Sequence, residues 1–263
     1  MQPYIILQYP YETIQVALCS HGKILTKVQE HKFNAIALTI PHIDSMLKTH
    51  NIALKDLQCI GVNVGPGPYN TLRALLTMAN GIHFASGLPL VGLSALDLLS
   101  DEYSDCNTLV IFQAFADHVF YQFKMQEKKE RGACSIDELI RIIANNEFLN
   151  TGSRTCPPKF STSLDTSPTR SGTLGTNDNL ARTNEGWISG MTKEESFLAL
   201  GNGAQLYQKK LVEAVGDKLI FPDIIPAFNS LETIAQKTFE KIEANQFETG
   251  YLKPIYFEDL TKN

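Results

Sequence analysis

The sequence predicts an α/β protein built from two lobes. Three observations indicate this fold class: an opening run of strand-like segments, an alternation of helices and strands after it, and a second run of strand-like segments from about residue 108. Such patterns are typical of domains in which helices cover a sheet. With 263 residues, 43% of them hydrophobic, the chain is long enough for two lobes with separate cores.

The first lobe is predicted to begin with three consecutive strands. Tyr4–Leu7 is a short apolar run, and residues 13–18 partly alternate between apolar and polar side chains. His21 and Gly22 form a plausible turn into a third strand at 23–28. This pattern indicates an antiparallel meander.

Two helices and two strands then alternate. Apolar residues at helical spacing predict a helix over about 33–49, which Pro41 should bend or deprive of a hydrogen bond. A buried strand at 59–64 leads into a helix over about 70–86, and 88–93 is predicted to be another strand. A meander followed by alternating units is what the ribonuclease-H-like half of an actin or sugar-kinase fold looks like.

The pattern restarts after about residue 99. Residues 108–113 and 119–124 are predicted to be paired strands, and Ser135 begins a helix with Glu138 three residues later, as in a capping box. We therefore expect a first lobe over 1–99 and a second lobe over 100–263.

The second lobe contains a tract of unusual composition. More than half of residues 150–192 are Ser, Thr, Gly, Pro or Asn, which predicts a long loop or disorder, with Trp187 as a candidate anchor. Order is expected to resume at 196–203, a strand running into a glycine turn. An amphipathic helix containing Leu231 and a closing strand at 253–257 complete the prediction.

The bulk composition limits the classes of function. No segment approaches the roughly 20 apolar residues of a membrane helix, and the first residues do not resemble a secretory signal, so a cytoplasmic protein is expected. The five cysteines are widely spaced without C-x-x-C, which favours reduced thiols over a disulfide framework or zinc site. A net charge of −5 argues against a grip on nucleic acid by this chain alone.

The strongest local motif is GVNVGPGPYNTLR at residues 61–73. A strand ends in glycines and leads into the first turn of a helix, where free backbone N–H groups favour an anion. A tight strand-to-helix turn without a ligand explains the same residues, and both interpretations stay open. The motif matches neither G-x-G-x-x-G nor a Walker loop.

Residues 61–99 resemble the TsaB family, also called YeaZ. The strand, the GPG turn, the Leu-Arg pair, the helix length, the GLPLVG segment and the following Ser-x-Leu match the family pattern without a gap. Weaker similarity is found at Ile40–Leu47, in LGNGA at 200–204 and in KPIYF at 253–257. The tract at 150–192 has no recognised counterpart.

The resemblance implies a two-lobed actin/Hsp70-like ATPase fold and a role in modifying tRNA. TsaB-like proteins pair with the related subunit TsaD, which carries the metal site and transfers threonylcarbamoyl to adenosine 37 of tRNA, and the ATPase TsaE joins them. TsaC-type enzymes make the threonylcarbamoyl-adenylate. By this resemblance the chain contacts TsaD, or a second copy of itself, through two neighbouring helices, and tRNA only through the complex.

Departures from the family pattern favour a degenerate, non-catalytic member. Gln8 stands where the family has Asp near the end of the first strand, and Gln113 stands at the first position of an Asp-Ala-Arg segment. Mg²⁺ prefers carboxylates to amides. The family's Ser-Phe-Thr-Gly is replaced by residues 68–71, Pro-Tyr-Asn-Thr. We therefore expect no cofactor of its own, with ATP or ADP bound only within a complex.

The candidate site residues form two groups. A loop near a nucleotide would contain Gly65, Gly67 and Arg73, and we predict no catalytic residue and no metal ligand. The helix at 70–86 has apolar residues on more than one face, which fits burial in the core or, as the resemblance favours, one core face and one partner face. The predicted partner interface comprises Ile36, Ile40, Ile43, Leu72, Leu76, Ala79 and His83.

Other classes of function fit the residues less well. A small-molecule phosphotransferase on the same fold would need acidic groups where Gln8 and Gln113 stand. A metallopeptidase would need the H-x-x-x-H pair that none of the six histidines supplies, and a serine hydrolase would need a G-x-S-x-G elbow. A divergent relative with another interaction role, which the 150–192 tract could serve, also stays open.

Overall fold

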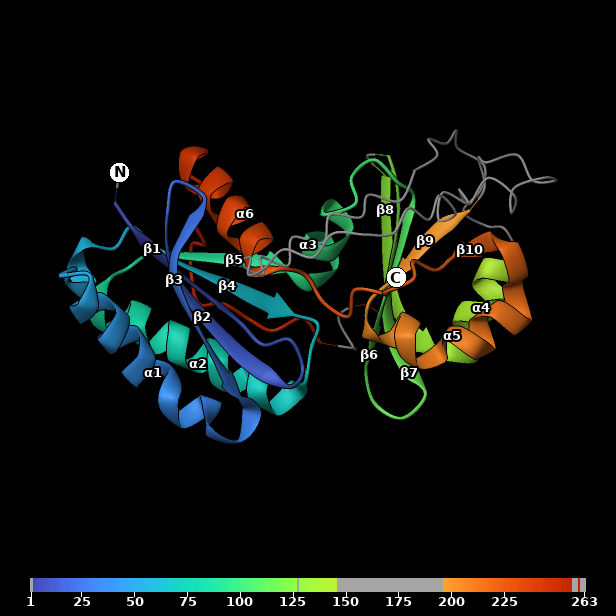
Figure 1. Ribbon diagram of the computed structural model, residues 1–263, viewed down its shortest axis with the longest axis horizontal. Helices are drawn as coiled ribbons and strands as arrows, with labels where there is room; N and C mark the ends of the chain where they lie inside the picture. The colour runs from blue at the N-terminus through green and yellow to red at the C-terminus, as the bar shows by residue number, and fades with distance from the viewer. Residues whose placement is uncertain (1, 127, 146–195, 257–259, 261–263) are drawn as a thin grey trace, which may run out of the picture.

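The computed structural model describes residues 2–126, 128–145, 196–256 and 260. Over these residues the chain forms two five-stranded mixed sheets, each with helices on both faces (Figure 1). The two-lobed α/β fold predicted from the sequence is confirmed. The predictions for 150–192, Trp187 included, lie outside the described residues.

The first sheet has the strand order β3-β2-β1-β4-β5. β1 pairs antiparallel with β2 and parallel with β4, so the meander joins the alternating units through β1. β1 is buried throughout because helices cover both faces of the sheet. The strands are β1 Tyr4–Gln8, β2 Thr13–Ser20, β3 Lys23–His31, β4 Ile60–Gly65 and β5 Leu90–Ser94.

The second sheet repeats this topology with the order β10-β9-β6-β7-β8. β6 takes the place of β1, since it is antiparallel to β7 and parallel to β9. β8 was not predicted, because its first four residues are charged and exposed. The strands are β6 Thr108–Gln113, β7 His118–Met125, β8 Lys128–Ser135, β9 Phe197–Leu200 and β10 Leu219–Ile220.

Three helices sandwich the first sheet. α1 (Lys32–Thr49) and α2 (Tyr69–Ser86) pack on one face, and α6 (Leu231–Glu243) packs on the opposite face (Figure 1). The predicted helices at 33–49 and 70–86 are thus confirmed, and Pro41 lies within α1. A side chain at Gly61 of β4 would overlap Thr238, which explains how α6 approaches the sheet so closely.

The second sheet is sandwiched in the same way. α4 (Ile136–Ala144) and α5 (Asn202–Val215) cover its outer face, whereas α3 (Ala95–Asp101) packs on the face turned toward the first sheet (Figure 1). Ser135 caps α4 as predicted, since its hydroxyl accepts a hydrogen bond from the Glu138 amide. Short 3-10 turns occupy Leu54–Asp56 and Gly216–Lys218.

The boundary between the lobes is more complex than a division at residue 99. α6 follows β10 in sequence yet covers the first sheet, and Leu252 after it is buried in the core beside α1 and α2, whereas Leu260 packs against the cluster of the second lobe. The assignment of all of 100–263 to the second lobe therefore needs correction. The predicted closing strand is absent over residues 253–256, although Ile255 N donates to Val64 O.

Candidate functional site

Buried amide side chains meet where β1 and β4 end, at the boundary between the lobes. Asn229 Nδ2 donates to Gln8 Oε1 over 3.0 Å, and Asn63 Nδ2 donates to Asn229 Oδ1 over 3.2 Å. Asn63 Oδ1 in turn accepts from the Gly65 amide at 2.9 Å. Gln8, Asn63 and Asn229 are each at most 4% exposed, so this amide relay is part of the interior.

The amide relay continues outward across the meander. Gln8 Nε2 donates to Gln15 Oε1, and Gln15 Nε2 donates to Gln29 Oε1 at the exposed edge of the first sheet. A buried polar side chain is tolerated when its hydrogen bonds are made within the protein. The end of β1, where the family pattern has an aspartate, is thus built into a network of neutral groups that satisfy one another.

The end of β6 in the second lobe is engaged by backbone and side-chain contacts. Gln113 N donates to Asn202 Oδ1 at 3.1 Å, and Gln113 O accepts from the Tyr11 hydroxyl at 2.9 Å. Asn202 belongs to the Gly-Asn-Gly turn noted in the sequence, where Gly201 has φ 98° and lies against Ile111. The two lobes are therefore in direct contact at the ends of their first strands.

The predicted nucleotide-proximal loop is tied at its first residue to the strand before it. The Gly65 amide donates to Asn63 Oδ1 at 2.9 Å, and a side chain at Gly67 would meet no atom within 4 Å. Gly65 has φ 97°, and a side chain there would meet Leu72, so the glycine is required by the turn. Arg73 is exposed and lies over the Tyr69 ring, with 5.1 Å from Cζ to the ring centroid.

The predicted partner-facing residues divide into a buried and an accessible set. Four of the seven lie in the core of the first lobe and are at most 5% exposed, so they cannot contact a partner in this conformation. The reason is that α2 packs on β4 and β5 and also against its neighbour α1 on the same face of the sheet, which buries more than one of its faces. The buried set is Ile43, Leu72, Leu76 and Ala79, and the accessible set is Ile36, Ile40 and His83.

Sequence reasoning missed the most exposed apolar side chains of this region. Phe84 on α2 is 79% exposed, and Tyr69 at its start is 56% exposed. Tyr251, at 57%, comes from the segment after α6 and packs edge-on against His83 with 5.8 Å between ring centroids. Helical spacing places Phe84 on a different face of α2 from the buried leucines, so its exposure could have been predicted from the sequence. No local pattern predicts that Tyr251 lies beside α2.

The exposed apolar side chains of α1 and α2 are here called the outer face: Ile36, Ile40 and Phe84. Ile36 and Ile40 are four residues apart on α1 and are 45% and 43% exposed. Ile36 and Ile40 lie in the first half of α1, and Phe84 lies near the end of α2. Scattered single apolar residues are normal on protein surfaces, but exposed apolar side chains on two helices that pack together make these helices a candidate interaction site. The outer face is the revised candidate for the predicted partner contact.

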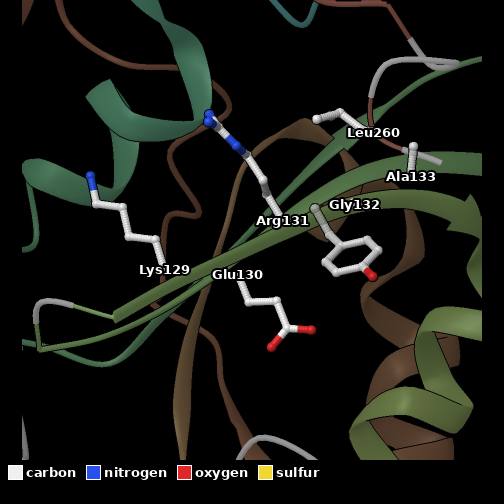
Figure 2. Close-up of a pocket in the computed structure, with 7 residues that line it drawn as sticks. Lys129, Glu130, Arg131, Gly132, Ala133 and Leu260 are labelled. Carbon is white, nitrogen blue, oxygen red and sulfur yellow. The ribbon is translucent and has the colours of Figure 1, made fainter. Parts of the chain in front are cut away.

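A pocket of about 420 Å³ beside β8 is a weaker candidate (Figure 2). Figure 2 shows the side chain of Glu130 on the opposite side of the strand from those of Lys129 and Arg131, so the charged groups diverge. Lys129 Nζ lies 2.7 Å from Asp97 Oδ1, and Arg131 lies 3.7 Å from the same carboxylate. These cations are paired within the chain.

A partly buried ion-pair cluster joins α3 to the second sheet. Lys124 Nζ lies 2.8 Å from Asp101 Oδ1, and Lys129 lies 3.3 Å from the same oxygen. Burial alone would raise the pKa of Asp101, but the hydrogen bonds and positive charges of both lysines outweigh it and hold the pKa below its usual value. This cluster is a structural device that fixes α3 between the lobes.

Metal ligands, membrane spans and cysteines complete the survey. Among the residues that the structure describes, no group of three or more His, Cys, Asp or Glu side chains is placed to hold a metal ion. Within the same part of the chain, no helix is long and apolar enough to cross a membrane. Cys19, Cys59 and Cys134 are free thiols, and Cys19 and Cys59 are buried.

The fold and its centre define a two-lobed protein of the actin-like class with amides at the ends of its first strands. YeaZ from Pseudomonas aeruginosa has the same fold, with a TM-score of 0.60 and 14% identity over 97% of this chain and 100% of that one. A second structure, described as an uncharacterized protein with similarity to peptidase YEAZ from Pseudomonas aeruginosa, also has a TM-score of 0.60. Its sequence is 16% identical, and the match covers 98% of this chain and 100% of that one. The resemblance to the TsaB (YeaZ) family is confirmed at the level of the fold.

Sequence comparison adds one match. The model of the TsaD family, described as tRNA N6-adenosine threonylcarbamoyltransferase, matches residues 32–153, which is less than half of the chain. This range includes α1, the GPG turn and α2. No curated protein matches the chain in sequence.

Proposed function

We propose that the chain is a non-catalytic partner subunit of the machinery that makes N6-threonylcarbamoyladenosine at position 37 of tRNA. It binds a TsaD-type transferase, and a TsaE-type ATPase joins the pair. The observation that carries this proposal is the combination of a YeaZ fold with a centre of neutral amides. The match of residues 32–153 to the TsaD family points to the same modification.

The non-catalytic part of the proposal rests on the chemistry of Gln8, Asn63 and Gln113. Phosphoryl transfer on such folds requires metal ions held by oxygen ligands, and an amide supplies no negative charge to balance them. Here the Gln8 and Asn63 amides are also committed to each other through Asn229. ATP or ADP is accordingly bound by the partner subunits and not by this chain alone.

The partner contact is assigned to the outer face. Ile36, Ile40 and Phe84 offer apolar area on two packed helices, and burying it on association would supply the main driving force. The same face could join two copies of this chain, so a homodimer would compete with the complex. The net charge of −5 fits contact with tRNA through the partner.

The test is binding to the TsaD-type transferase of the same cell, measured by co-purification and by titration calorimetry. Phe84→Asp places a charge in the outer face and should weaken binding at least tenfold, which corresponds to about 1.4 kcal/mol. The matched control is Leu206→Asp, because Leu206 is 55% exposed on a helix of the other lobe. Its affinity should equal that of the wild type.

Two results would contradict the proposal. If the wild-type chain does not bind the transferase, the similarity to YeaZ concerns only the fold. If Leu206→Asp weakens binding as much as Phe84→Asp, the outer face is not the contact. Sedimentation of the chain alone separates a homodimer from a monomer, and Phe84→Asp should dissociate a homodimer built on the same face.

A further inference from the structure

The turn between β1 and β2 reaches into the cores of both lobes. Tyr9, 4% exposed, belongs to the core formed by the first sheet with α1 and α2. Tyr11, two residues later, packs against the cluster of the second lobe that contains Phe112. One short turn therefore holds a side chain in each half of the molecule.

Tyr11 makes three contacts that cross between the lobes. Its ring stands edge-on to Phe228, with 5.9 Å between centroids, and lies 6.4 Å from the ring of Phe112. Its hydroxyl donates to Gln113 O at 2.9 Å. Burial raises the pKa of the Tyr11 hydroxyl, so the group stays protonated and keeps its donor.

The backbone at this position favours a different residue. Tyr11 has φ 63°, in the left-handed region that glycine adopts readily and that an aromatic residue occupies only at a cost in free energy. A residue held in such a conformation indicates that its side chain has a role that offsets the cost. The contacts of the Tyr11 ring and hydroxyl with the second lobe supply that role.

The segment that returns from the second lobe to the first is fixed beside Tyr11. Phe228 packs on Tyr11, and Asn229 bonds to Gln8 and Asn63 of the first sheet. Ser230 N donates to Glu102 Oε1 at 2.6 Å. Three consecutive residues of this connecting segment therefore each pack against or hydrogen-bond to another part of the molecule.

From these contacts we propose that Tyr11 is a latch that fixes the angle between the two lobes, so that the chain moves as one rigid body and does not open and close. Hinge motion requires a few residues that can change their backbone angles freely. Here the turn is anchored in both cores and the returning segment is anchored on both sides. The inference does not depend on the proposed function.

The test is the distribution of distances between two spin labels, one on each lobe, at Lys55→Cys and Lys209→Cys. Both positions are exposed, and burial, with the nearby Glu138, raises the pKa of the Cys134 thiol to about 11, which slows its labelling. The test variant is Tyr11→Gly, because glycine suits φ 63° and removes only the side chain. The protein with native Tyr11 should give one narrow distance distribution, and Tyr11→Gly a distribution at least twice as broad.

Two further variants make the result specific. Tyr4→Phe removes a buried hydroxyl that donates to Ala235 O within the first lobe, and it should leave the distribution narrow. Tyr11→Phe keeps the ring but not the hydroxyl, and should broaden the distribution less than Tyr11→Gly. A folded Tyr11→Gly protein with the narrow distribution would overturn the proposal, as would equal broadening in Tyr4→Phe.

Discussion

The centre of the molecule and its outer face use polar and apolar groups in opposite ways. At the centre, polar side chains such as Gln8, Asn63 and Asn229 are buried and bonded to one another. On the outer face, apolar side chains such as Ile40 and Phe84 are exposed on α1 and α2. The centre thus consists of neutral groups that satisfy one another, whereas the periphery keeps uncovered apolar surface. The proposal that this chain acts by contact rests on that difference.

The largest loss of stability is expected when a charged side chain is placed at a buried position of α2. Ala79 is fully buried, so Ala79→Arg forces a charge into the core and should lower the free energy of unfolding by about 4 kcal/mol or more. Phe84→Asp, five residues along the same helix, should change it by no more than about 0.5 kcal/mol. Urea denaturation of the two variants checks this, and equal losses would mean that the two faces of α2 are wrongly assigned.

A smaller loss is expected when the ion pair between α3 and the second sheet is broken. Asp101→Asn leaves Lys124 buried without its carboxylate and should cost about 1.5–3 kcal/mol at pH 7. Because the folded pKa of Asp101 is lowered, its contribution is complete above the unfolded pKa of about 3.9 and is lost as the pH falls through the folded pKa. The difference in the free energy of unfolding between the variant and the wild type should therefore disappear as the pH falls below about 4.

Thermal unfolding measured between pH 3 and pH 7 gives this comparison. The control is Asp44→Asn, because its pair with Lys48 is exposed on α1 and should contribute less than about 1 kcal/mol at any pH. A gap for Asp101→Asn that is the same at pH 3 and pH 7 would show that charge has no part in it.

The amide relay can be tested by restoring an acid at its centre. In Gln8→Glu, the oxygen that replaces Nε2 faces the acceptors Gln15 Oε1 and Asn229 O, so the carboxyl must be protonated to keep a hydrogen bond. Its folded pKa should therefore rise above the unfolded value of about 4.3. The variant should match the wild type at low pH and lose about 1–3 kcal/mol as the pH rises to 7.

Gln29→Glu is the matched control for this variant. Gln29 is exposed and only accepts from Gln15 in the relay, which a carboxylate does equally well. Chemical denaturation at pH 4 and pH 7 should show a pH-dependent loss for Gln8→Glu alone. A Gln8→Glu protein as stable as the wild type at pH 7 would mean that the centre accommodates an acid.

The sequence predicted local elements well and long-range packing poorly. The meander and the helices at 33–49 and 70–86 follow from apolar patterns that each segment contains in itself. α5 was missed although Ala204, Leu211 and Val215 recur at helical spacing, because the glycine turn before it dominated the interpretation. The return of α6 to the first sheet could not be predicted, since it depends on contacts far apart in sequence.

Only part of the candidate site could be predicted, because it too depends on contacts between residues far apart in the sequence. Gln8 and Gln113 were identified as amides in place of acids, but the partner of Gln8, Asn229, lies 221 residues away and no local motif marks it. The partner-facing set was only partly accessible, because periodicity shows that α2 is apolar on several faces but not which face a neighbouring helix covers. The structure buries Leu72, Leu76 and Ala79 in the core of the first lobe, whereas the prediction placed them toward a partner.

Hydrogen exchange of the chain, with and without the TsaD-type transferase, tests the contrast between centre and outer face most directly. We expect slower exchange in α1 and α2 on mixing, and no change in the segments that contain Gln8, Gln113 and Asn229. Protection confined to those central segments, with α1 and α2 unchanged, would contradict the proposal that this chain acts through its outer face.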